Sequence, residues 1–168
     1  MIASPTTERL KGKVKSRGIR LSPPLTEQEV AAFEGSNGVN LPADYREFLL
    51  HVGNGGGGPP EHGLCTLGTK PSDFNFSLPD LSKAFPFTQP WLWEDGDISS
   101  EGERADVYRG VVILGTDGCG QYWGLVARGP DFGKIWMLAD VGIQPTNPKM
   151  TFTEWYESWL DGKRNWWG

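Results

Sequence analysis

Three apolar runs in the second half of the chain constrain the fold more than any other feature of the sequence. Residues 111–114 (Val-Val-Ile-Leu), 121–127 and 134–138 are each of strand length and rich in β-branched and aromatic side chains. Asp117-Gly118 separates the first two runs, and a glycine-containing segment at 128–133 separates the last two. Short connections of this kind join antiparallel neighbours, so we expect an antiparallel meander.

Helices are predicted on both sides of this β region. Residues 26–29 (Thr-Glu-Gln-Glu) form a capping box, in which the threonine hydroxyl and the last glutamate each satisfy an amide of the first turn. A second box at 151–154 (Thr-Phe-Thr-Glu) starts a C-terminal helix. Between them, Pro42 precedes apolar residues at helical spacing, and Gly53 ends that helix. The predicted fold class is α+β, an antiparallel sheet packed by N-terminal helices and one C-terminal helix.

Charge divides the chain of 168 residues, which is the size of one domain, into a basic tail and an acidic remainder. Residues 1–20 hold six basic side chains and one acid, and the other 148 residues carry a net charge of −10. Because residues 1–20 contain few large apolar side chains, we expect a disordered basic tail, followed by a single domain at 21–168. The tail is either a solvated terminus or a contact for nucleic acid. The acidic domain would repel phosphate, which argues against nucleic-acid binding through the folded part.

Cysteine content and hydropathy predict a cytoplasmic protein. Two cysteines, Cys65 and Cys119, are too few to cross-link a secreted scaffold of this size, and no signal-like apolar stretch follows Met1. The longest apolar run, at 111–114, is far shorter than the roughly 18 residues expected of a membrane-spanning helix. We therefore expect no membrane contact.

Catalytic and metal-binding patterns are weak throughout the sequence. The soft metal ligands are His51, His62, Cys65 and Cys119. None of them has the spacing of a metal site, and the one local nucleophile pair, His62 and Cys65, sits where a cysteine is usually a small core residue. The glycine runs at 53–58 and 115–120 lack the lysine or the following helix of a phosphate-binding loop. These patterns predict a protein that is not an enzyme and has no cofactor or metal.

The candidate partner-binding residues lie in an acidic, proline-rich insert near 71–109. Its prolines recur too often for a long helix, so we expect this part of the molecule to be exposed. Two tryptophans and six acids form the candidate set: Trp91, Trp93, Glu94, Asp95, Asp97, Glu101, Glu103 and Asp106. Aromatic anchors with a charged rim are typical of protein interfaces. The alternatives are that the acids form a solvated face and that the tryptophans belong to the core.

In order and spacing these motifs resemble the SUKH superfamily, which includes bacterial immunity proteins against secreted toxins and a fungal regulator of cell-wall synthesis. The resemblance rests on 41–45 (Leu-Pro-Ala-Asp-Tyr) with the Gly53-Asn54-Gly55-Gly56 exit, on the turn within 113–120, and on 152–155 (Phe-Thr-Glu-Trp). It spans about residues 22–162, and the chain departs from it in the insert and in Cys119. The resemblance implies an α+β fold without catalytic residues or a cofactor.

The same resemblance implies a protein partner. Its first implication is a cytosolic immunity protein that neutralises a toxin by direct binding. The expected partner is a basic toxin domain, because nucleases that hold nucleic acid tend to be basic and residues 21–168 are acidic. A regulatory or adaptor domain of the same fold is the alternative, and an enzyme that uses Cys65 or the acids is a third possibility.

Overall fold

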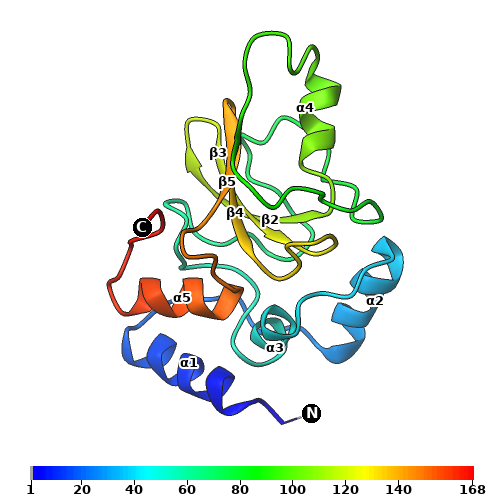
Figure 1. Cartoon of the computed structure of the whole chain (residues 1–168). Helices are drawn as coiled ribbons and strands as arrows, with labels where there is room; N and C mark the ends of the chain where they lie inside the picture. Colours follow the sequence, from blue (N-terminus) through cyan, green and yellow to red (C-terminus); the bar gives the residue numbers. More distant parts are fainter. Residues whose placement is uncertain (1) are drawn as a thin grey trace.

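A five-stranded antiparallel sheet forms the centre of the structure, a computed structural model that describes residues 2–168 (Figure 1). In chain order the strands are β1 (Trp91–Leu92), β2 (Val111–Gly118), β3 (Gln121–Val126), β4 (Ile135–Ala139) and β5 (Gly142–Pro145). Their order across the sheet is β1-β5-β4-β3-β2, and every pair is antiparallel. The predicted meander is confirmed as β2, β3 and β4, and the predicted α+β fold class is confirmed with it. The first turn lies at Cys119-Gly120 and not at the predicted Asp117-Gly118, because β2 continues through Gly118, which pairs with Gln121, and Cys119 and Gly120 have the positive φ that a tight hairpin turn needs.

Within residues 2–168, five helices accompany the sheet: α1 (Pro5–Ser16), α2 (Glu27–Asn37), α3 (Ala43–His51), α4 (Glu101–Val107) and α5 (Phe152–Leu160). Both predicted capping boxes are present, at the starts of α2 and α5. At α2 the Glu29 amide donates to the Thr26 hydroxyl over 3.1 Å, and the Thr26 amide donates to the Glu29 carboxylate over 2.8 Å. No helix within residues 2–168 has the length and apolar character needed to cross a bilayer.

The first hydrophobic core lies between one face of the sheet and helices α1, α3 and α5. Figure 1 shows these three helices together at the lower end of the sheet. The ring of Phe152 on α5 packs 4.9 Å from that of Phe48 on α3, and Trp155 packs 5.3 Å from Trp123 on β3. Phe152, Trp155 and Leu160 are buried as the helical spacing predicts.

The second core covers the opposite face of the sheet, and the segment at 71–109 builds it. Side chains of a strand alternate between faces, and in β4 this places Trp136 and Leu138 on the second face. Phe74, Phe85 and Tyr108 pack against that face and are fully buried. The prediction that 71–109 is an exposed part of the molecule is therefore wrong for its aromatic residues. Prolines exclude a long helix from this segment, but they do not prevent an irregular chain from burying rings.

Helix α1 contradicts the prediction that residues 1–20 form a disordered tail; Met1 itself lies outside the described residues. The Ser4 hydroxyl caps the helix by accepting from the Thr7 amide, and proline occupies the first turn. Leu10 and Val14, one turn apart, are buried in the first core. Composition missed this helix because only a narrow apolar stripe is needed when the rest of its surface is charged.

Ion pairs join α1 to α5. The Arg9 guanidinium donates to the Glu157 carboxylate over 2.8 Å, and the Lys13 ammonium contacts Glu157 and Asp161 over 3.1 and 2.8 Å. The hydrogen bond from Arg9, with further contributions from Lys13, lowers the pKa of Glu157 from its ordinary value of 4.5 to about 2. A carboxyl group whose pKa is lower in the folded state stabilises the fold above its unfolded pKa.

We expect this contribution to disappear as the pH falls from about 4.5 to about 2. The Glu157→Gln variant, which cannot ionise, should therefore lose less stability across this interval than the wild type. Urea denaturation at several pH values measures the difference. Glu8→Gln on α1 removes an exposed acid and should keep the wild-type slope. Equal slopes for wild type and Glu157→Gln would contradict the prediction.

Candidate protein-binding surface

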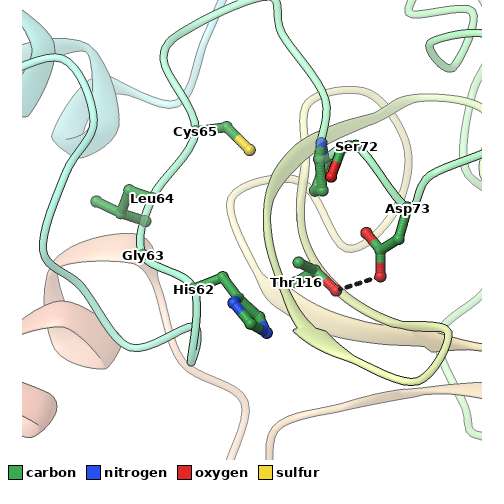
Figure 2. Close-up of a pocket in the computed structure, with 8 residues that line it drawn as sticks. His62, Gly63, Leu64, Cys65, Ser72, Asp73 and Thr116 are labelled. Atoms are coloured by element: carbon green, nitrogen blue, oxygen red, sulfur yellow. Dashed lines mark hydrogen bonds between the residues drawn. The ribbon is translucent and has the colours of Figure 1, made fainter.

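The pair offered as a possible nucleophile, His62 and Cys65, lines a pocket of about 380 Å³ beside β2. Figure 2 shows Ser72 and Asp73 on the opposite wall, where the Thr116 hydroxyl lies 3.2 Å from the Asp73 carboxylate. Burial raises the pKa of the Cys65 thiol, and the charge of Asp73 raises it further. The neutral thiol is a poor nucleophile, so this geometry does not support catalysis by Cys65. Within residues 2–168, no cluster of three His, Cys, Asp or Glu side chains is placed to hold a metal ion.

The two edges of the sheet differ in how their backbone groups are satisfied. At the β2 edge, the His62 amide donates to Thr116 O over 3.2 Å and the Cys65 amide donates to Leu114 O over 2.7 Å, so the segment at 62–65 covers this edge. At the other edge, β1 is the last strand of the sheet, and no further strand of residues 2–168 pairs with it. Edge strands with free backbone groups can accept another chain.

Trp91 and Trp93 form part of an aromatic cluster on the second face of the sheet. Trp91 stacks on Phe87 with 5.5 Å between ring centroids, and its edge contact with Trp93 has a centroid distance of 5.4 Å. The Trp93 indole N–H donates to Asp140 O over 2.8 Å. Both tryptophans are half-buried and pack on the second core. They hold β1 in place, which limits their use as anchors for a partner.

Three of the six candidate acids have structural roles within the molecule. Asp97 accepts a hydrogen bond from the Glu94 amide over 2.9 Å and closes a turn. The Glu103 carboxylate accepts from the amide and hydroxyl of a serine just before α4, and these hydrogen bonds lower the pKa of Glu103. Asp106 pairs with Arg109 over 3.3 Å. These three acids organise α4 and the turn that precedes it.

The other three acids are unpaired. Glu94, Asp95 and Glu101 are exposed, and their carboxylates make no hydrogen bond or ion pair with any residue of the described range 2–168. All three lie between the end of β1 and the first turn of α4. Their charges are therefore available to a cationic partner, and they are the part of the predicted set whose environment fits that role.

Two exposed aliphatic residues, one in β1 and one just before β5, were not predicted from the sequence. Leu92 is 76 % exposed and Val141 is 63 % exposed. They border a hollow of about 170 Å³ on the first face of the sheet, whose apolar lining includes Pro90, Met137 and Ala139. Alternation along β1 was the available signal, because two inward tryptophans at 91 and 93 require the residue between them to point to the other face.

One known protein family matches most of the chain. The family model described as SMI1 / KNR4 family (SUKH-1) matches residues 24–158. The matched region contains the whole sheet and helices α2 to α4, ends within α5, and leaves α1 outside. Neither a curated protein nor a solved structure gives a significant match.

Proposed function

Because the chain belongs to the SMI1 / KNR4 family (SUKH-1), we propose that it is a cytosolic immunity protein that neutralises a toxin domain by direct protein–protein binding. The observation that carries the proposal is a group of three unpaired carboxylates next to two exposed aliphatic side chains. We define the β1 surface as Leu92, Val141, Glu94, Asp95 and Glu101. The remaining members of the predicted set are outside this surface: the two tryptophans pack on the second core, and the other three acids organise α4 and the turn that precedes it.

The charge of the molecule supports a basic partner. Residues 21–168 carry a net charge of −10, and unpaired charges steer an oppositely charged protein during its diffusional approach. A nuclease toxin must hold phosphate and therefore tends to be basic. Exposed aliphatic residues beside the acids supply the desolvated contact that charge alone does not.

The double variant Glu94→Gln/Asp95→Asn is expected to slow association with the toxin domain encoded beside this gene by about fivefold to tenfold at low salt, because rim charges act mainly on the association rate. The difference should shrink near 0.3 M salt, where screening shortens the range of these charges. Surface plasmon resonance at two salt concentrations measures both effects. The matched control is Glu8→Gln/Glu61→Gln, which removes the same net charge from two other exposed acids.

Equal slowing in both double variants would show that only net charge matters and would remove the β1 surface from the proposal. Co-expression of the chain with the neighbouring toxin tests the immunity function itself, and cell survival is the expected result. If no toxin module adjoins the gene and no protection occurs, the immunity function fails. Capture of a housekeeping protein through the β1 surface would then support a regulatory adaptor.

A further inference from the structure

The free edge of β1 carries an inference about how a partner binds. We propose that the β1 surface binds an extended segment of its partner as an additional β-strand, and that this segment alternates apolar and basic side chains. The inference rests on the proposed function, because it names the segment of the partner that the β1 surface would hold. The backbone, the apolar side chains and the basic side chains of the partner segment would each contact a different feature of the β1 surface.

The backbone of β1 offers one free donor and one free acceptor at Leu92. The Trp93 amide donates to Val141 O over 3.1 Å, and Trp91 lies opposite Ile143 in the antiparallel register. In an antiparallel pair, every second residue of a strand hydrogen-bonds to the same neighbouring strand, and the residues between them point their N–H and C=O groups the other way. The backbone N–H and C=O of Leu92 therefore point away from β5, toward the position that an added strand would occupy. Recognition by strand addition uses main-chain groups of this kind.

The apolar side chains of the added strand would meet the first face of the sheet. Leu92 and Val141 stand at the rim of the hollow of about 170 Å³ there. Gly142 allows β1 to lie close to β5 at this point, since a Cβ at that position would lie 2.5 Å from Trp91 O and 2.8 Å from Leu92 Cδ2. A valine or leucine entering the hollow would remove its own surface and that of Leu92 from water.

The basic side chains of the same strand would point to the second face, where α4 lies. Tyr108, at the end of α4, shares the second core with Trp91, and Figure 1 shows α4 beside the upper end of the sheet. Glu101 is in the first turn of α4, and Glu94 and Asp95 follow β1 directly. Since successive side chains of a strand point to opposite faces, a partner strand that satisfies both faces alternates apolar and basic residues.

A second copy of the chain fits this edge less well. Pairing two β1 strands would double the number of unpaired carboxylates at one interface without adding a cation to meet them. Like charges placed close together across an interface are unfavourable. The acids that attract a basic strand therefore also protect the edge from self-association, which is a common use of charge at sheet edges.

Titration of the ¹⁵N-labelled full-length chain with a seven-residue peptide of alternating valine and lysine tests the inference. We expect the largest amide shifts at Leu92 and Val141, and binding at least tenfold tighter than for a valine/glutamate peptide or for a peptide with its valines and lysines in separate blocks. Leu92→Ala should weaken binding because it empties the rim of the hollow. Shifts confined to α1, or equal affinity for all three peptides, would overturn the inference.

Backbone methylation of the peptide separates strand addition from simple charge attraction. The peptide is methylated either on the amides of its odd-numbered residues or on those of its even-numbered residues. One of these two sets should abolish binding and the other should leave it unchanged, because only one edge of the peptide faces β1. Equal effects of the two sets, or a concentration-dependent dimer of the chain in place of peptide binding, would overturn strand addition. A chain that binds its toxin through Glu94 and Asp95 but binds no peptide would overturn this inference alone and leave the proposed function standing.

Discussion

Phe85→Ala is expected to lower the free energy of unfolding by about 3–5 kcal/mol, the usual cost of removing a fully buried phenylalanine ring. Phe85 is 0 % exposed, and its ring lies 4.9 Å from Trp136 of β4 and 5.2 Å from Phe87. Truncation would leave a cavity on the second face of the sheet that the surrounding rings can fill only in part. Chemical denaturation followed by far-ultraviolet circular dichroism measures the loss.

The backbone around Phe85 makes collapse of this cavity difficult. The Phe85 amide donates to Arg128 O over 2.9 Å. Gly110 and Gly129 both have positive φ, and a Cβ on either would collide with the Phe85 backbone. Leu92→Ala in the same segment is the matched control, because its side chain is 76 % exposed and its loss should change stability by no more than about 0.5 kcal/mol. Similar stabilities for the two variants would mean that the second core contributes little to the fold.

Leu10→Ala is expected to destabilise the protein by about 2–4 kcal/mol and to release α1 from the first core. Leu10 is 1 % exposed, although it lies in a strongly basic stretch of the chain. Once its apolar contact is lost, the exposed ion pairs that remain between α1 and α5 are too weak to hold the helix, since such pairs contribute about 0–1 kcal/mol. Denaturation midpoints give the change in stability, and the rate of trypsin cleavage at the basic residues of α1 reports its release.

The control for α1 is Lys11→Ala, the next residue in the chain, whose side chain is exposed. It should retain the wild-type midpoint within about 0.5 kcal/mol. If residues 1–20 were a disordered tail, Leu10→Ala and Lys11→Ala would have the same denaturation midpoint, and trypsin would cleave Leu10→Ala as quickly as the wild type. A difference between these neighbouring substitutions therefore tests the docking of α1 directly.

The sequence does not distinguish the paired acids of the candidate set from the unpaired ones. Six carboxylates lie within 94–106, and the sequence predicts all six equally as contacts for a partner. Their environments differ, because Asp106 has an arginine within 3.3 Å whereas Asp95 has no partner among residues 2–168. Only the placement of cations and amides around each carboxylate separates an acid that stabilises the fold from one that is free to bind.

The sequence by itself determined the features that depend on neighbours a few residues apart. The capping boxes at Thr26 and Thr151, the antiparallel strands β2 and β3 and the α+β class all follow from local hydrogen bonds and from side-chain periodicity. Membership of the family follows from the same motifs in the same order. These signals are strong because the interacting groups are close in the chain.

Tertiary structure alone decided the docking of α1, the second core and the composition of the β1 surface. Leu10 is buried by helices that begin more than 30 residues later, and Phe85 by a strand about 50 residues later. Leu92 is exposed because Trp91 and Trp93 are held on the other face by the second core. The free energy of burial depends on which distant surface covers a side chain, and the local patterns in 1–20 and 71–109 do not specify that surface.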